Sequence, residues 1–437
     1  MDDCLCRADP GINRIDHLLH TREDIAMHPP DATRTGDLDS VYFYRPGELL
    51  VGAADVEEVA RALAELRVSV CRRAEPVDGV AHLVVSSRHG VPDLIARLRR
   101  SAGRPLALTP NHVLFGCQGS WHFSPATEPR PAPVPPEDDD SRGDWGATVI
   151  AVVDTGLAAD AASLPPLDQG VGPGPDGRFE DPDEDHDGLL DAEAGHGTFV
   201  AGVIRLRATG APIVAARVLD SEGVVDEVSL AQQIGSLLEV GPEILNLSLG
   251  GYTREDQPLL ALSWLEEHER RPLIVAAAGN NSQSRPFYPA ALSWVVGVGA
   301  VDVVVVEEDL TVLEEMEIDP DGKGAEAVEV IEEIEVDEYV AVRAAFSNFG
   351  PWVDCCAPGV DIDSTYQSGI SRSPSDGMLR AFSGGATWSG TSFAAPQVSG
   401  AVADHMHQHA GTSAATAMQA ILAGAPDGPP GLGKLVL

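Results

Sequence analysis

The segment ATVIAVVDTG, residues 147–156, is an apolar run that ends in an aspartate and a glycine. Polar and apolar residues do not alternate along it, as expected for a strand covered on both faces of a parallel sheet. Similar short runs follow and alternate with helical segments: 213–218, 244–247, 273–277 and 295–298. We therefore predict strands at 148–153 and at these four runs, in an α/β domain with a doubly wound, mostly parallel sheet.

Polar residues stand at the ends of predicted strands, where open α/β sheets carry their functional groups. The first strand ends at Asp154, and the strand at 273–277 leads into Asn280. His196 and Ser392 each stand at the start of a predicted helix. Each residue alone has an ordinary explanation as a turn, packing or helix-capping residue. Together they supply the carboxylate, amide donor, imidazole and hydroxyl that nucleophilic acyl transfer needs.

Several segments resemble the signature blocks of the subtilase family of serine proteases, and they occur in the family's order. They are VVDTG (152–156), GHGTFVAG (195–202), NLSLGG (246–251), VAAAGNN (275–281), YPAALSWVVGVGAVD (288–302), FSNFGPWVDCCAPG (346–359) and GTSFAAPQVSG (390–400). The resemblance covers roughly residues 145–410, apart from insertions. It implies a subtilisin-like fold and a serine endopeptidase that hydrolyses peptide bonds through an acyl-enzyme.

The resemblance also implies a role for individual residues. Ser392 resembles the nucleophile, His196 the base that takes its proton, and Asp154 the carboxylate that orients the histidine. Asn280 would donate its side-chain amide to the oxyanion, together with the backbone N–H of Ser392. The chemistry needs no cofactor. Contacts with the substrate backbone are expected at Ser248, Leu249, Gly250 and Gly279.

Composition divides the chain into four parts. We predict a poorly ordered polar arm at 1–45, a small α+β domain at 46–120, a proline-rich acidic linker at 121–144 and the peptidase domain at 145–437. The linker should be stiff, extended and solvated, and the peptidase domain should begin near Trp145.

The part at 46–120 has the predicted order β-α-β-α-β, with Asp55 as the candidate N-cap of the first helix. Strands are predicted at 49–51, 80–86 and 106–115, and helices at 55–66 and 91–100. Position and pattern resemble the inhibitor-like propeptide of subtilases. The hypothesis is a zymogen whose own N-terminal domain is an intramolecular inhibitor until the chain is cut within 115–145. The alternative is a permanent accessory domain.

An acidic loop precedes His196. Its spacing, Asp183-x-Asp185-x-Asp187-Gly188, is like the first half of an EF-hand loop, but the twelfth position is Ala194 rather than Glu. Two interpretations stay open: a structural calcium site near these aspartates, or a solvated loop. The metal residues are otherwise unknown.

An acidic insertion at 303–342 separates two of the matching blocks. Residues 301–340 hold 16 Asp and Glu against one Lys. The alternation at 328–342 predicts an edge strand or hairpin, and the rest is too charged to pack. We expect a solvated segment on the surface. The alternative hypothesis is that this segment forms the rim of the binding cleft and selects basic substrates or a regulator.

Charge and composition exclude several classes of function. The net charge of −39 argues against nucleic-acid binding, which needs clustered Lys and Arg. No apolar run is long enough for a membrane span, and the acidic start does not resemble a signal peptide, so we expect a cytoplasmic protein. Its six cysteines are then expected as reduced thiols. An intracellular processing protease is the favoured interpretation, and a catalytically silent peptide-binding protein is the alternative.

Overall fold

A computed structural model of the protein describes most of the chain. The described residues are 19, 21–28, 41–116, 128–135, 145, 148–311, 333–373 and 375–437, with the backbone alone at 305–311 and 333–339. Most of the predicted arm, the acidic end of the predicted linker and the cysteines Cys4, Cys6 and Cys117 lie outside these ranges. The other three cysteines, Cys71, Cys355 and Cys356, are free thiols.

The peptidase-like part is built on a nine-stranded sheet in the order β21-β16-β14-β13-β11-β7-β9-β8, with β15 paired to β14. Every pair along this path is parallel, and only β15 runs antiparallel to its neighbour. The strands are β7 (Ile150–Asp154), β8 (Val171–Pro173), β9 (Ile213–Arg217), β11 (Ile244–Leu247), β13 (Leu273–Ala277), β14 (Val296–Thr311), β15 (Glu333–Arg343), β16 (Cys355–Pro358) and β21 (Lys434–Leu435). The predicted mostly parallel α/β sheet is confirmed.

Side chains of one strand enter two different cores, one on each face of the sheet. In β7, Ile150 and Val152 pack on one face, while Ala151 and Val153 pack on the other. Both faces are therefore dry, which explains why the sequence of this strand does not alternate. The predicted strands at 244–247 and 273–277 have the observed bounds, and the predicted strand at 295–298 is only the beginning of the longer β14.

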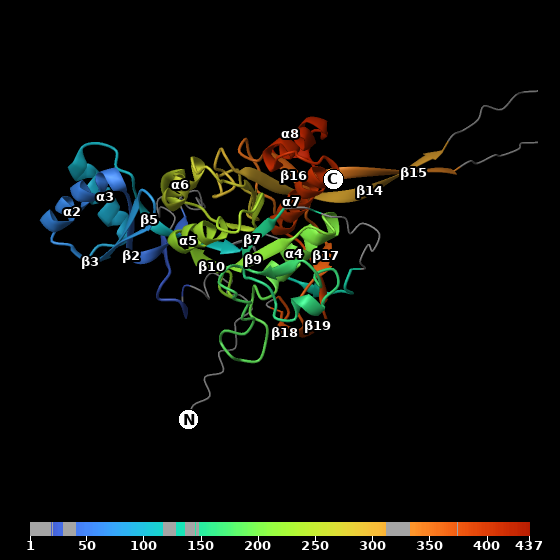
Figure 1. Ribbon diagram of the computed structural model, residues 1–437, viewed down its shortest axis with the longest axis horizontal. Helices are drawn as coiled ribbons and strands as arrows, with labels where there is room; N and C mark the ends of the chain where they lie inside the picture. Colours follow the sequence, from blue (N-terminus) through green and yellow to red (C-terminus); the bar gives the residue numbers. More distant parts are fainter. Residues whose placement is uncertain are drawn as a thin grey trace, which may run out of the picture.

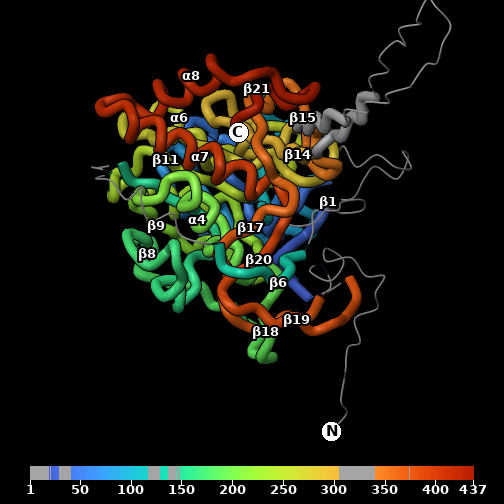
Figure 2. The backbone as a smooth tube through the Cα atoms, turned by 90° about the vertical axis from the view of Figure 1, so that its right-hand side faces the viewer, coloured from blue at the N-terminus to red at the C-terminus, as the bar shows by residue number. Residues whose placement is uncertain are grey.

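Helices cover both faces of this sheet. On one face lie α4 (His196–Arg207) and α7 (Thr391–Gln408), which contact each other, with α8 (Ala414–Gly424) against α7 (Figure 2). The other face carries α5 (Glu227–Leu237) and α6 (Ser263–Glu266). The smaller strands nearby are β6 (Arg130–Pro131), β10 (Val224–Asp226), β12 (Leu249–Gly250), β17 (Ile362–Thr365), β18 (Gly369–Arg372), β19 (Leu379–Phe382) and β20 (Gly385–Trp388). No helix in the described part of the chain is long and apolar enough to cross a membrane.

A second, smaller sheet forms the N-terminal domain at one end of the molecule (Figure 1). Its elements are β1 (Ala26–His28), β2 (Tyr42–Gly52), α2 (Val56–Glu65), β3 (Ser69–Val77), β4 (Val80–Ser86), α3 (Val91–Ala102) and β5 (Leu108–Gly116). Buried leucines of both helices, such as Leu63 and Leu94, pack with Leu49 of β2 in one core. The domain therefore has its own apolar core beneath two helices.

Three predictions about this part of the chain were wrong in detail. The order is β-α-β-β-α-β, because β3 was missed. The boundary at residue 45 falls inside β2, and Ala26–His28 pairs with that strand instead of belonging to a poorly ordered arm. Asp55 does not cap α2 with its side chain; it accepts hydrogen bonds from Arg104 and from the backbone N–H of Ala107.

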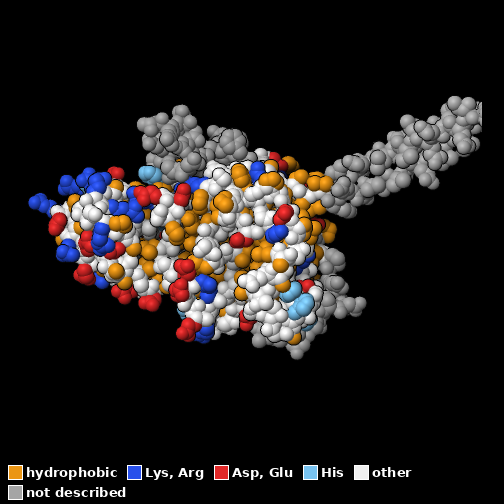
Figure 3. Space-filling model, turned by 90° about the horizontal axis from the view of Figure 1, so that it is seen from above, with side chains coloured by type: hydrophobic (Ala, Val, Ile, Leu, Met, Phe, Trp, Pro, Cys, Tyr) orange, Lys and Arg blue, Asp and Glu red, His pale blue; other side chains and the backbone are white. Residues whose placement is uncertain are grey.

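The N-terminal domain also differs from the rest of the chain in net charge. Residues 46–116 hold nine arginines and eight acidic residues, whereas the whole chain has a net charge of −39. Figure 3 shows Lys and Arg side chains gathered at the end of the molecule that this domain forms. Its exposed arginines include Arg61, Arg72, Arg73, Arg97 and Arg100. This part is therefore nearly neutral, and the negative charge of the protein lies in the rest of the chain.

The described part of the predicted linker, 128–135, is not a free solvated segment. Its strand β6 pairs antiparallel with β20. The Glu128 carboxylate accepts hydrogen bonds from the Arg380 guanidinium at 2.8 Å and from the backbone N–H of Ser375 at 2.9 Å. This segment is therefore held on the peptidase-like part, and so is Trp145, which stacks on His407.

The acidic insertion begins and ends in a long hairpin. β14 and β15 stay paired from Val301–Arg343 out to Thr311–Glu333, which agrees with the predicted edge strand or hairpin. Figure 1 shows this arm leaving the body at the end opposite to the N-terminal domain. The predicted charged tip between residues 311 and 333 lies outside the described residues.

Candidate active site

Two glycines let Asp154 and His196 approach each other. Asp154 is the last residue of β7, and His196 is the first of α4. Gly195, just before the helix, has a φ of +83°, which favours glycine. A Cβ on Gly197 would lie 2.2 Å from the carbonyl oxygen of Gly156, so the turn after β7 can rest on α4 only because position 197 has no side chain.

Asp154 and His196 form a fully buried pair. The Nδ1 atom of His196 lies 2.7 Å from Oδ1 of Asp154, and the backbone N–H of Thr155 donates to the same oxygen at 2.7 Å. This contact places the imidazole proton on Nδ1 and leaves Nε2 as an acceptor. Among the residues that the structure describes, Nε2 of His196 has no hydrogen-bond partner. The nitrogen that a base would use is therefore available.

Ser392 is the second residue of α7 and is buried. Its Oγ donates to the carbonyl oxygen of Ser248 at 3.3 Å, and the hydroxyl of Ser248 donates back to the carbonyl oxygen of Ser392 at 2.8 Å. The hydroxyl must rotate from this contact to reach an acceptor on His196. Loose contacts of this kind are common in active sites without a bound substrate.

Asn280 is held by one end of its amide. Its Oδ1 accepts hydrogen bonds from the backbone N–H of Thr391 at 2.9 Å and from the Thr391 hydroxyl at 2.8 Å. The preceding Gly279 has a φ of +93°, and its N–H donates to the Thr391 hydroxyl at 3.0 Å. Because Oδ1 is used in this way, the Nδ2 group beside Gly390 is the donor end of this side chain.

The loop that carries Asn280 is fixed by Asn348, which the sequence did not single out. The Oδ1 atom of Asn348 accepts from the backbone N–H groups of Asn281 and Gln283, both at 3.0 Å. Its Nδ2 donates to the carbonyl oxygen of Ala278 at 2.8 Å. Asn348 stands in the block FSNFG, so that signal was present in the sequence. Thr391 also stands in one of the quoted blocks, GTSFAAPQVSG, but its role in orienting the Asn280 amide was not predicted.

Two buried carboxyl groups near the pair were also missed. Burial raises the pKa of Glu180 to about 8, and its Oε1 accepts from the N–H of Gly195 at 2.9 Å. Burial alone would lower the pKa of His196, but the charge and the hydrogen bond of Asp154, with Glu193 and Glu180 nearby, outweigh it and raise this pKa. The site thus favours the imidazolium that proton transfer would create.

The segment Ser248–Gly250 lies beside Ser392 and is already paired. Its strand β12 runs antiparallel to the end of β5, with Leu249 opposite Gly116 and Gly250 opposite Phe115. On the other side, β10 also pairs with β5, with Val224 opposite Phe115. The last residues of the N-terminal domain therefore lie as an extended strand between two strands of the peptidase-like part.

The aspartates of the acidic loop come together as a group. Carboxylate oxygens of Asp183, Asp185 and Asp187 all lie within 4.8 Å of one another. Oxygen ligands at this spacing suit a hard cation such as calcium. The same carboxylates also accept from backbone N–H groups: Asp183 from Asp187 and Gly188, and Asp187 from Leu189.

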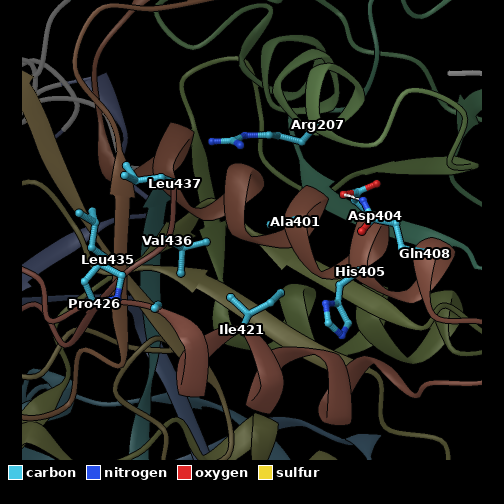
Figure 4. Close-up of a pocket in the computed structure, with 11 residues that line it drawn as sticks. Arg207, Ala401, Asp404, His405, Gln408, Ile421, Pro426, Leu435, Val436 and Leu437 are labelled. Carbon is cyan, nitrogen blue, oxygen red and sulfur yellow. Dashed lines mark hydrogen bonds between the residues drawn. The ribbon is translucent and has the colours of Figure 1, made fainter. Parts of the chain in front are cut away.

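A separate hollow of about 420 Å³ lies away from these residues. Figure 4 shows its lining: Asp404, His405 and Gln408 on the C-terminal half of α7, Ile421 on α8, and the last residues of the chain. Ser392 is at the opposite end of α7. This hollow is therefore not part of the site described above.

The fold places the buried His196–Asp154 pair between the end of β7 and the start of α4. The ring of Phe393, the residue after Ser392, lies 5.4 Å from that of His196, so a serine, a histidine and an aspartate are gathered in one region of the fold. Such a constellation, with an amide donor beside it, can attack an acyl carbon and stabilise the oxyanion that forms. The model of the subtilase family (Peptidase S8) matches residues 146–434. The chain belongs to the subtilase family.

The relatives are proteases of the same family. The thermophilic serine proteinase of Bacillus sp. (strain AK1) is 34% identical over 266 residues, which cover 58% of this chain and 51% of that protein. Thermitase of Thermoactinomyces vulgaris is 29% identical, with 49% of this chain and 62% of thermitase covered. The chain thus spans about half of the length of the first of these relatives. The solved structure of fervidolysin from Fervidobacterium pennivorans shares the fold, with a TM-score of 0.57 and 20% identity over 90% of this chain and 60% of that one.

Proposed function

We propose that the protein is a serine endopeptidase in which Ser392 is the nucleophile, His196 the general base and Asp154 its orienting carboxylate. The observation that carries the proposal is the buried His196–Asp154 pair with an available Nε2, whose ring lies 5.4 Å from that of Phe393, the residue after Ser392. Membership in the subtilase family supports the same activity.

In this proposal Ser392 Oγ bonds to the carbonyl carbon of the substrate while its proton moves to His196 Nε2. Asn280 Nδ2 and the backbone N–H of Ser392 donate to the oxyanion. The imidazolium then protonates the leaving amine, and water hydrolyses the acyl-enzyme with His196 again as base.

The direct test is labelling with a fluorophosphonate probe, which reacts with an activated serine. Wild-type protein should be labelled at Ser392, and the Ser392→Ala variant should not. A folded wild-type protein that binds peptides but takes up no label would favour the catalytically silent binder instead.

We further propose that the N-terminal domain is an intramolecular inhibitor and that processing cuts the chain within residues 117–127. Gly116 lies opposite Leu249 in the strand pairing beside Ser392. Glu128 is bound to Arg380 on the peptidase-like part. A cut between these two positions would free the domain and leave the segment from residue 128 in place.

The test is a time course of purified full-length protein by gel electrophoresis and mass spectrometry. Wild type should yield two fragments that meet within 117–127, while Ser392→Ala stays intact. Active enzyme that remains a single uncut chain would favour a permanent accessory domain.

We also propose that the acidic loop binds calcium through Asp183, Asp185 and Asp187. Support comes from the gathered carboxylate oxygens and their alternating spacing. Removal of calcium with a chelator should lower the Tm, and this loss should disappear in Asp185→Asn but persist in Asp160→Asn, an exposed aspartate outside the loop. An unchanged Tm of the wild type on chelation would contradict the proposal.

A further inference from the structure

A buried carboxyl group faces the last described residue of the N-terminal domain. Glu193 is fully buried, and a Cβ placed on Gly116 would lie 3.5 Å from its Cδ and 3.6 Å from its Oε2. On another side, the same Cβ would lie 3.4 Å from Cδ1 of Leu219. These are ordinary contact distances, so a Cβ at this position would touch Glu193 and Leu219 without a clash.

The backbone fixes Glu193 between the bound strand and the catalytic histidine. Its N–H donates to the carbonyl oxygen of Ser221 at 2.9 Å, and its own carbonyl oxygen accepts from the N–H of His196 at 3.1 Å. Ser221 belongs to the turn that leads to β10, which pairs with β5. The carboxyl group of Glu193 is therefore placed against one position of whatever chain occupies this groove.

We propose that Glu193 is a specificity-determining residue, which favours substrates with a hydrogen-bond donor side chain at the position aligned with Gly116 and rejects acidic ones. This inference rests on the proposed peptidase function. Because the Cβ itself would lie 3.6 Å from Oε2, a donor one or two bonds beyond it is within reach of a hydrogen bond to this oxygen, which suits Thr, Ser or Asn. A carboxylate there would share a dry groove with the Glu193 carboxyl group, so that one of the two must take up a proton, which disfavours binding near neutral pH.

A glycine at position 116 suits an inhibitory strand that must dissociate from the cleft after the chain is cut. Gly116 itself has no side chain to contact Glu193, so this position of the bound strand would forgo the contact that a donor side chain makes there. The cleft would then prefer a substrate residue with a donor over its own covalently attached strand once the chain is cut.

The test is the cleavage of a proteome-derived peptide library by the processed enzyme, read by mass spectrometry. Two substrate pairs of nearly equal shape separate the effects: Thr against Val tests the donor, and Asn against Asp tests the charge. At one fixed position before the cleaved bond, wild type should prefer Thr over Val and Asn over Asp, each by about tenfold. Glu193→Gln should reduce the Asn/Asp preference at this position to within about twofold.

The control is Glu239→Gln, a change of an exposed glutamate, which should leave every preference unchanged. Ratios within a pair are used because Glu193→Gln also alters the charge near His196 and hence the overall rate. An Asn/Asp preference that survives in Glu193→Gln, or is missing in wild type, would overturn the inference while the peptidase function stands. Loss of all cleavage and of fluorophosphonate labelling in wild type would instead refute the proposed function.

Discussion

Among the residues that the structure describes, two histidine–carboxylate pairs are fully buried on both sides and have nearly equal geometry. In one, Nδ1 of His196 lies 2.7 Å from a carboxylate oxygen of Asp154; in the other, Nδ1 of His112 lies 2.8 Å from one of Glu227. All four side chains are fully buried. Burial and pairing therefore do not distinguish a catalytic histidine from a structural one.

The difference lies in the remaining polar atoms. Nε2 of His112 accepts the backbone N–H of Arg254 at 3.1 Å, and the second oxygen of Glu227 accepts the N–H of Ala261 at 2.7 Å. This pair is saturated, and it joins β5 of the N-terminal domain to the peptidase-like part. Nε2 of His196, by contrast, has no partner in the described part of the chain. A histidine can act as a base only if its second ring nitrogen is available to accept a proton, and this property separates His196 from His112.

The largest expected effect on activity comes from a change in the His196–Asp154 pair. Asp154→Asn should lower kcat/KM of the processed enzyme by about 10⁴, because the imidazole loses its orienting acceptor and takes the wrong tautomer. The matched change in the saturated pair, Glu227→Gln, should leave kcat/KM within about twofold. Steady-state kinetics on one peptide substrate measures both, and comparable losses in two well-folded variants would contradict the distinction.

A smaller effect is expected from breaking the saturated pair in the full-length chain. His112→Ala leaves the Glu227 carboxyl buried without its histidine donor, which costs about 1–3 kcal/mol at the interface between the two parts. Activity should therefore appear faster, with the specific activity of the fully processed enzyme unchanged. The control is His89→Ala, an exposed histidine of the same domain. Identical activation curves for both variants would show that this pair does not hold the domain.

A third prediction concerns the pH dependence of stability. Burial raises the pKa of Glu180 from 4.5 to about 8, so the folded protein keeps a proton that the unfolded chain loses. The free energy of unfolding should therefore fall as the pH rises from about 4.5 to about 8 through this group. Denaturant unfolding should show a smaller fall in Glu180→Gln, and equal slopes in the two proteins would contradict the assignment.

The smallest effect is expected from the acidic arm. Its paired part leaves the body at the end opposite to the N-terminal domain, whose last strand lies beside Ser392 (Figure 1). Replacing residues 303–342 by a short turn should leave the cleavage of Arg/Lys-rich and of acidic peptides unchanged relative to each other. A selective loss of basic-peptide cleavage would support the hypothesis of a rim that selects substrates.

The sequence predicted the central sheet well because its strands are buried on both faces. Apolar runs such as 244–247 and 273–277 are short enough to favour strands over helices, and parallel strands bring their polar carboxyl ends to one edge. The candidate residues Asp154 and Asn280 could therefore be found from strand ends alone. His196 and Ser392 stood out at the starts of predicted helices, and the family's ordered blocks then implied the role of each of the four residues.

What the sequence did not predict depends on contacts between distant segments. Strand β3, SVCRRAEPV, is exposed along most of its length, so it carries no apolar pattern. Glu180 and Glu193 stand among many acidic residues, and only folding buries them beside His196. The pairing of Gly116 with Leu249 joins two parts of the chain with no shared local signal.

We propose that the protein is a serine peptidase whose cleft is filled by its own N-terminal strand. Fluorophosphonate labelling and chain mass can be followed together during incubation of the purified full-length protein. Label should appear on Ser392 of a shortened chain that begins within residues 117–128, and the uncut chain should be labelled far more slowly. Equally rapid labelling of the intact 437-residue chain would show that the N-terminal strand does not block the cleft.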